Sequence, residues 1–428
     1  MWLGQTALNP ERPDDSLADI AQQKQSMDLQ FQQFNQDPCL PGHRNPYEIY
    51  AALRQQSAVH WCEGPQMWVV LGYSESVELM RDSRLSRHDH LDHLISRFGH
   101  NGQIYEHQKQ DLPYMDGKQH ARMRQHVSKA YRGIDMAGLA SFASLFAVER
   151  LSRVQGDEHF DLVALLANEL SIMVVSELMG VPASQQLDVA NQVSAFVRAR
   201  GLTQNEKSAS GGNEALDVYR KFFLPLIHER RGGTGKDLLS RLIADPEEGI
   251  HLSDDQLLLI ISSNFYSASL YTLRLLIGTM AWAMASHPAT YQRLRNDRTL
   301  LAPAVEEVLR WDPPAQAINA STATEDLHIA DQIIRAGDSI TALVGAANRD
   351  PKVFEQPDAF LIDRSPNPHL SFAPGLHQCL GLQLARMQGA AVLSVLCDQF
   401  ECLHCVQAES KLQIADRFRG YERLILHR

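Results

Sequence analysis

The spacing of apolar and polar residues changes twice along the chain. A helical period over 45–56 leads into two short runs, 59–64 and 67–72, whose composition predicts strands. From about 115 to 310, apolar residues recur three and four positions apart, which predicts mostly helices. Strand-like runs return at 326–330, 332–337 and 339–345, after the prolines at 313 and 314. We therefore predict a mainly α protein with small β-sheets, an α+β fold in one interwoven domain.

The domain boundaries follow from composition. Residues 1–36 are polar and rich in glutamine, so we expect a flexible polar leader there and a single domain over 37–428. The stretch 203–215, TQNEKSASGGNEA, predicts a loop between two amphipathic helices. The longest apolar stretch, 257–285, contains Asn264 and Arg274, which favours a buried helix over a membrane span. We expect no membrane anchor.

Charge and cysteine content exclude some classes of protein function. The formal net charge of −11 argues against a general nucleic-acid partner, because such proteins carry a basic surplus. Six cysteines in 428 residues are too few for a disulfide framework, and no signal peptide is recognisable at the N-terminal end. These observations predict a cytoplasmic protein.

One cysteine stands in an unusual setting. In HLSFAPGLHQCLG, residues 369–381, Cys379 is bracketed by Phe372, Gly375 and Gly381, and an apolar helical run follows. The glycines allow tight turns or close approach to a flat ligand. A helix N-terminus next to the thiol is expected to lower its pKa, and a thiolate in an apolar pocket is a suitable axial ligand for heme iron. The alternative is a buried structural cysteine.

The same stretch resembles the heme-binding signature of the cytochrome P-450 family. Phe372, Gly375, His377, Cys379 and Gly381 stand at the spacing of that signature, and the resemblance extends over roughly residues 38–428. It implies a triangular, helix-rich domain that holds heme b between a long distal helix and the helix after the cysteine. It further implies that Cys379 is the metal ligand, bonded to iron as thiolate.

A further motif resembles the family's structural brace. Glu307 and Arg310 stand three apart on a predicted helix, so they share one face. They resemble the buried Glu-x-x-Arg pair that braces the segment under the heme. The family often has an arginine or histidine where this chain has Ala359, so the brace is expected to be completed differently.

The resemblance also implies partners for the two heme propionates. His120 and Arg124, four apart on one helical face, resemble the family's His-x-x-x-Arg, and His377 is expected to be a third partner. Carboxylates need such cationic or hydrogen-bonding groups when they are partly buried. The family commonly has a further arginine where this chain has Ser321, so one propionate contact is expected to be weakened or rearranged.

The distal motif departs from the family pattern. Ala268–Thr272, ASLYT, aligns with the family's Ala-Gly-x-Asp/Glu-Thr, which bulges over the iron and relays protons. Thr272 is kept, Ser269 replaces the glycine and Tyr271 replaces the acid. A phenol with a pKa of about 10 is not an ionised relay at neutral pH, although Tyr271 and Ser269 could pass protons through hydroxyls. A third reading is that the tyrosine points away from the site.

The resemblance implies an oxidoreductase, a heme-thiolate monooxygenase that hydroxylates an unactivated C–H bond of a small or medium apolar biosynthetic metabolite. Dioxygen is the expected co-substrate, and ferredoxin with ferredoxin reductase is the expected electron source, docking near Arg122, Lys129 and Arg132. The altered distal acid leaves open an atypical enzyme that uses peroxide or catalyses coupling, rearrangement or desaturation. A non-catalytic heme-binding protein is the second alternative.

Two histidine and cysteine groups invite a separate metal site. His88, His90, His93 and His100 lie close together in the sequence, and Cys402 and Cys405 form a single Cys-x-x-Cys pair. Neither has the regular ligand spacing or the second pair that zinc sites show. We interpret both cysteines as structural and the histidines as part of a loop over the distal pocket.

Overall fold

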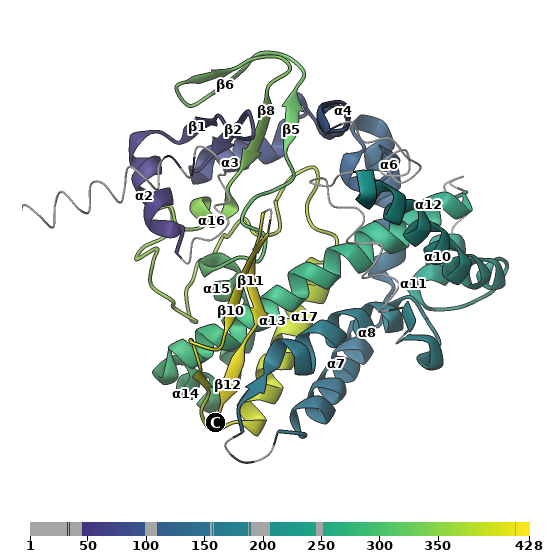
Figure 1. Ribbon diagram of the computed structural model, residues 1–428, viewed down its shortest axis with the longest axis vertical. Helices are drawn as coiled ribbons and strands as arrows, with labels where there is room; N and C mark the ends of the chain where they lie inside the picture. Colours follow the sequence, from purple (N-terminus) through teal and green to yellow (C-terminus); the bar gives the residue numbers. More distant parts are fainter. Residues whose placement is uncertain are drawn as a thin grey trace, which may run out of the picture.

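The structure is a computed structural model that describes residues 45–98, 109–154, 158–186, 206–244, 251–415 and 417–428, and the single residues 32, 34, 156, 188 and 189. Figure 1 shows helices over the right and lower parts of the molecule and a sheet at its upper left. The mainly α fold with small sheets is thus confirmed.

The helices account for most of the chain between the sheet strands. They are α2 (Tyr47–Gln56), α3 (Tyr73–Arg81), α4 (Arg87–Phe98), α6 (Gly117–Arg132), α7 (Met136–Leu151), α8 (Asn168–Leu178), α10 (Glu206–Arg230), α11 (Leu238–Ala244), α12 (Asp254–Leu259), α13 (Ala268–Ser286), α14 (Pro288–Asn296), α15 (Leu301–Trp311), α16 (Val344–Ala347) and α17 (Leu382–Gln399). Of the described helices, none is long and apolar enough to cross a bilayer.

The strands form one five-stranded sheet and smaller pairings. The large sheet has the order β1-β2-β8-β5-β3, and the predicted strands at 59–64 and 67–72 are its first two members. The other pairings are β10-β11, β4-β12-β9 and β6-β7. The bounds are β1 (Val59–Cys62), β2 (Met67–Val70), β3 (Leu85–Ser86), β4 (Phe160–Asp161), β5 (Ser321–Ala323), β6 (Leu327–Ile329), β7 (Gln332–Ile334), β8 (Ser339–Ala342), β9 (His404–Cys405), β10 (Lys411–Ala415), β11 (Phe418–Arg423) and β12 (Ile425–His427).

The long apolar stretch forms the central helical rod of the fold. α12 begins in a capping box made by Ser253 and Gln256, and the rod continues through a π-helical stretch, Ile260–Ser267, into α13. α13 packs against α8, α15 and α17, so it is buried on several sides. The expected bulge at Ala268–Thr272 needs correction, because the widened turns lie just before it and these five residues are α-helical.

The loop predicted over 203–215 is also corrected. Residues 206–215 are the first turns of α10, and 203–205 lie outside the described residues. The segment contains alanine, glutamate and lysine, which are good helix formers, and extending an existing helix costs far less than nucleating one. Most of the predicted leader, 1–36, also lies outside the described residues, but Phe34 is buried with its ring 6.4 Å from that of Tyr50.

A buried carboxylate ties α15 to the segment that leads to the cysteine. Arg310 donates to both oxygens of Glu307 at 2.8 Å, and neither side chain is exposed. Arg310 also donates to the carbonyl of Ala359 at 2.9 Å. Arg364 supplies a second guanidinium, with Nε 3.1 Å from Glu307 Oε2. Arg364, five residues after Ala359, thus supplies the cationic side chain that this protein lacks at position 359.

We predict that Glu307→Gln lowers the free energy of unfolding by about 3–5 kcal/mol, because it leaves two buried guanidinium groups without their carboxylate. Chemical denaturation followed by circular dichroism measures this change. Glu325→Gln is the control, since Glu325 pairs with Arg84 at an exposed site and its loss is expected to cost less than about 1 kcal/mol. Equal effects of the two variants would contradict the bracing role.

Candidate functional site

A large cavity lies between the central rod and the cysteine segment. Its atom-free space is about 1170 Å³, a value that includes open solvent at the mouth. The walls come from the N-terminal half of the rod, the start of α17, the residues after α15 and segment 371–381. They include Ala268, Ser269, Thr272, Leu273, Leu276, Phe372, His377, Cys379, Gly381 and Leu384. A ligand in this cavity would therefore contact both the central rod and the cysteine segment.

Backbone contacts fix the turn that presents Cys379. Its N–H donates to the carbonyl of Phe372 at 2.9 Å. A Cβ at Gly375 would lie 2.0 Å from the carbonyl oxygen of Met80, so only glycine fits beneath α3 at this point. A Cβ at Gly381 would lie 3.9 Å from the Cys379 sulfur, which is an ordinary contact. The two glycines predicted to shape the loop thus meet different steric constraints.

The Cys379 thiol is accessible from the cavity. The expectation that its pKa is lowered is corrected: desolvation raises the pKa of Cys379 above its ordinary value, although the Gly381 N–H and the charges of Arg124 and Arg386 act in the opposite direction. α17 begins only at Leu382, and one helix N-terminus does not offset the desolvation. A metal ion bonded to the sulfur would favour the thiolate.

Four basic side chains gather at one side of the cavity. Arg87, His120, Arg124 and His377 all line it, and the rings of His120 and His377 lie 4.1 Å apart. Burial, reinforced by the neighbouring charges of Arg87, His120 and Arg124, lowers the pKa of His377 to about 2. Burial and Arg124 also lower the pKa of His120. The charged forms of the two imidazoles are thus disfavoured in this wall.

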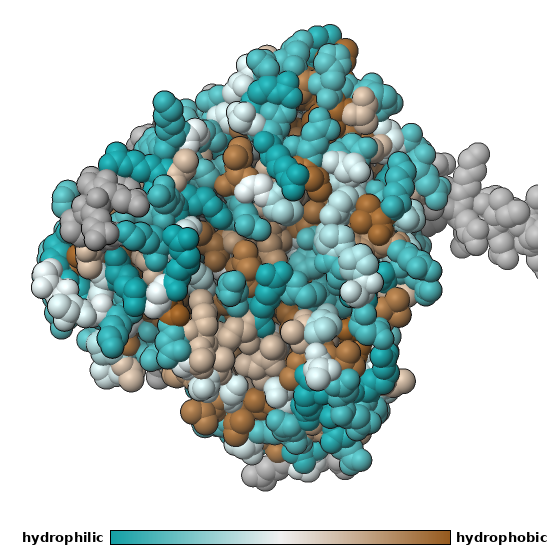
Figure 2. Space-filling model, turned by 180° about the vertical axis from the view of Figure 1, so that it is seen from behind, coloured by the Kyte–Doolittle hydropathy of each residue, from teal (hydrophilic) through white to brown (hydrophobic). Residues whose placement is uncertain are grey.

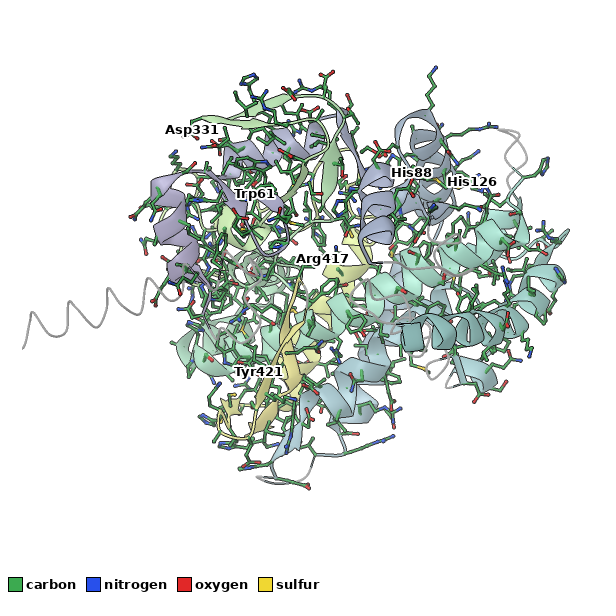
Figure 3. All side chains as sticks on the ribbon, turned by 45° about the horizontal axis from the view of Figure 1, so that its top comes forward. Trp61, His88, His126, Asp331, Arg417 and Tyr421 are labelled. Atoms are coloured by element: carbon green, nitrogen blue, oxygen red, sulfur yellow. The ribbon has the colours of Figure 1, made fainter. Side chains whose placement is uncertain are left out.

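Arg87 is the member of this group that sequence analysis missed. Burial, with the charge of Arg417, lowers the pKa of Arg87 to about 10. Figure 3 shows Arg417 near the middle of the molecule, beside the end of the β10–β11 hairpin. β3 pairs with β5 so that Ser86 stands opposite Thr322. Arg87, the next residue, therefore lies beside Ser321. Position 321 is where the family commonly has an arginine.

The residues present fit a heme group. Propionates are carboxylates, and this basic wall offers them four partners. In the described part of the chain, these four residues make one ion-pair contact, in which His377 Nε2 lies 4.0 Å from Asp116 Oδ1. Asp116 already accepts from the Ser86 hydroxyl and the His88 N–H. Apolar side chains around Cys379 suit the faces of a macrocycle, and a thiol at the centre of one wall suits an iron ligand.

The distal residues divide into two groups. Ala268, Ser269 and Thr272 line the cavity, and the Thr272 hydroxyl donates to the carbonyl of Ala268 at 2.6 Å. Tyr271 is not among the lining residues, and its ring stacks on Phe418 of β11 with the centroids 6.1 Å apart. This placement argues against a proton relay through Tyr271. It agrees with the hypothesis that the Tyr271 side chain points away from the site.

The other histidines and cysteines were the remaining candidates for a metal site. Within the described ranges, no group of three potential ligands is close enough to hold a metal ion. His90 contacts the Ser339 hydroxyl at 3.2 Å, and Figure 3 shows His88 on α4. His100 and the side chain of His93 lie outside the described residues. Cys402 and Cys405 are not joined in a disulfide.

Three comparisons place the chain among known proteins. Residues 212–417 match the family model described as cytochrome P-450. Cytochrome P-450 126 of Mycobacterium tuberculosis is 30% identical over 399 residues, which span 89% of this chain and 94% of that protein. The solved structure of the cytochrome PksS of the Bacillus subtilis 168 bacillaene polyketide synthase has a TM-score of 0.80 and 27% identity, covering 90% of this chain and 97% of that one.

A further solved structure shows a relative together with a protein partner. It is the cytochrome BioI in complex with an acyl carrier protein that bears hexadec-9Z-enoic acid. Its TM-score is 0.78 at 27% identity, and the match covers 90% of this chain and 98% of that one.

We predict that Gly375→Ala destabilises the protein by about 3 kcal/mol or more, because the new methyl group would overlap the Met80 carbonyl and the backbone would have to shift. Gly381→Ala is the matched substitution in the same loop, and its methyl group has space, so its unfolding midpoint is expected to stay near that of the unmodified protein. Thermal unfolding of both variants tests this, and a reversed order would contradict the loop geometry.

Proposed function

The chain belongs to the cytochrome P-450 family of heme-thiolate monooxygenases, and we propose that it oxidises an unactivated C–H bond of a small or medium apolar biosynthetic metabolite. The observation that carries this proposal is the cavity wall opposite Cys379, where Ala268, Leu273 and Leu276 are apolar and only a few hydroxyls interrupt them. The biosynthetic part rests on relatives named for polyketide and biotin biosynthesis.

We assign the cofactor contacts as follows. Cys379 would hold the heme iron through its sulfur, and Phe372, Gly375 and Gly381 shape the loop that presents it. His120, Arg124, His377 and Arg87 would bind the propionates. When bound, heme supplies the activation of dioxygen and the transfer of one oxygen atom to the substrate. Ala268 lines the wall opposite the cysteine loop and is assigned to contact with the macrocycle.

We assign proton delivery to hydroxyl groups on α13. Ser269 is buried and Thr272 half-buried, and both line the cavity. Each hydroxyl both donates and accepts, so each can pass on a proton without changing its own charge. Tyr271 has no part in this route.

Electrons are proposed to come from a ferredoxin and its reductase. Arg122, Lys129 and Arg132 lie on α6, the helix whose His120 and Arg124 reach the cavity. An acidic ferredoxin at this helix would therefore be close to the site, and its binding would weaken as salt screens the charges.

A second candidate function follows from the placement of Tyr271. Because no carboxylate stands at position 271 and the tyrosine stacks on Phe418 instead, the usual acid is missing from the cavity wall. A heme-thiolate enzyme that uses peroxide needs no proton delivery to dioxygen, because its oxidant arrives already reduced. An enzyme that catalyses coupling, rearrangement or desaturation is the other form of this alternative. This alternative shares every cofactor contact with the first.

The experiment that separates the two candidates supplies the purified enzyme with fatty acids, terpenes and polyketide thioesters under two conditions. One contains NADPH, ferredoxin, its reductase and isotopically labelled dioxygen, and the other contains hydrogen peroxide alone. A product that carries one labelled oxygen atom supports the monooxygenase. Products formed only with peroxide, or without added oxygen, support the alternative.

We predict that Thr272→Ala lowers product formed per NADPH consumed by about tenfold or more, because proton delivery by a positioned group typically contributes 10²–10⁴-fold. Tyr271→Phe removes only a hydroxyl outside the cavity wall and is expected to leave this ratio unchanged. Product and NADPH are measured in the same assay. A loss in Tyr271→Phe comparable to that in Thr272→Ala would refute the assignment of Tyr271.

We predict that Arg87→Leu speeds heme loss about tenfold or more, because a hydrogen bond to a charged group contributes about 1.5–3 kcal/mol. Transfer of heme to an excess of apomyoglobin, followed by absorption, measures the rate. Arg84→Leu is the control, since Arg84 pairs with Asp82 on the surface and is expected to have no effect. Equal rates in both variants would exclude Arg87 as a propionate partner.

A further inference from the structure

A buried serine and aspartate meet where the π-helical stretch of the central rod lines the cavity. Ser263 lies in the π-helical stretch Ile260–Ser267, lines the cavity and donates its hydroxyl proton to the carboxylate of Asp111. Asp111 is fully buried and directly precedes Leu112 and Pro113, which also line the cavity. No role in heme binding or proton delivery has been assigned to this pair.

This hydrogen bond determines what Ser263 offers to a ligand. A serine hydroxyl has one proton and two acceptor lone pairs. Since the proton is directed at Asp111, the cavity meets the hydroxyl as an acceptor. Asn264 also lines the cavity, and its Oδ1 is buried without a hydrogen-bond partner within the described part of the chain. Ser263 thus offers the cavity an acceptor, and the adjacent Asn264 amide has an acceptor oxygen that no group in the described part of the chain uses.

The surroundings and position of Ser263 and Asn264 suit recognition of a substrate rather than a part in its oxidation. Leu112, Pro113 and Phe265 are the apolar neighbours on the same wall. Nine residues separate Ser263 from Thr272, which corresponds to about 13 Å along a helix. A group bound at Ser263 would therefore lie well away from the distal residues that face Cys379.

We propose that Ser263 and Asn264 form a recognition site for a hydrogen-bond donor, a hydroxyl or amino group, at the end of the substrate remote from the oxidised carbon. Asp111 is a positioning residue that fixes the direction of the Ser263 hydroxyl. The inference rests on the proposed function and narrows its substrate class to apolar molecules with one terminal donor. A terminal carboxylate is disfavoured, because it brings two further acceptors and a charge of the same sign as Asp111.

The test uses probes that the heme itself anchors, so that no knowledge of the natural substrate is needed. They are 1-alkylimidazoles with chains of six to twelve carbons that end in a methyl, a hydroxyl or a carboxylate group. The imidazole binds the iron, and the shift of the Soret band measures the dissociation constant of each probe. The holoenzyme is used throughout.

At the chain length that reaches Ser263, the hydroxyl probe is expected to bind about tenfold more tightly than the methyl probe, as one buried hydrogen bond allows. The carboxylate probe is expected to bind more weakly than the hydroxyl probe. Equal dissociation constants for the hydroxyl and methyl probes at every chain length would overturn the proposal.

Two variants test whether the preference for the hydroxyl probe depends on Ser263 and Asp111. Ser263→Ala is expected to abolish the preference for the hydroxyl probe, and Asp111→Asn to reduce it, since an amide can turn the Ser263 hydroxyl around by donating to it. Ser262→Ala is the matched control: its hydroxyl donates to the carbonyl of Leu259 at 3.2 Å and does not line the cavity. A preference that survives in Ser263→Ala and Asn264→Leu would contradict the site.

The outcomes also separate this inference from the proposed function. If no imidazole probe shifts a Soret band, the protein lacks a ligand-accessible heme and the proposed function fails. If all probes shift the band with the same affinity, the heme site stands and only the recognition site is wrong.

Discussion

The buried carboxylate of Glu307 is the interaction on which the position of the cysteine segment depends. It accepts from Arg310 within its own helix and from Arg364 and the Leu361 N–H of the later chain, so α15 and residues 357–367 are held as one unit. The connection continues through Asn348, whose side chain accepts from the Leu370 N–H at 2.7 Å. Ser371 in turn donates to the carbonyl of Leu309 at 2.6 Å. Phe372 and the turn to Cys379 follow directly from these fixed residues.

Another wall of the cavity comes from the central rod, where Ala268, Leu273 and Leu276 stand beside the hydroxyls of Ser269 and Thr272. Basic groups from the start of α4, from α6 and from the cysteine loop line this cavity, and the buried Asp111–Ser263 pair adjoins it through Ser263. Figure 2 shows that polar residues cover most of the reverse face of the molecule, with apolar residues in scattered patches.

Sequence could predict those parts of the site that lie within one short segment. The cysteine loop, the Glu307–Arg310 spacing and the His120–Arg124 spacing each depend on local geometry, and the structure brings Cys379, His120, Arg124 and His377 to one cavity. Arg87 was missed because only the pairing of β3 with β5 reveals that it stands beside Ser321. Arg364 and Asp111 were missed for the same reason, as their partners are distant in sequence. The direction of Tyr271 is set by Phe418, more than a hundred residues later.

The measurement that tests the central claim most directly is the absorption spectrum of the purified protein after reduction with dithionite and exposure to carbon monoxide. The account predicts a Soret band at the strongly red-shifted position of thiolate-ligated carbonyl heme, and loss of that band in Cys379→Ser. A red-shifted band that persists in Cys379→Ser would contradict the ligand assignment. A fully reconstituted sample that binds no heme would contradict the account of the whole site.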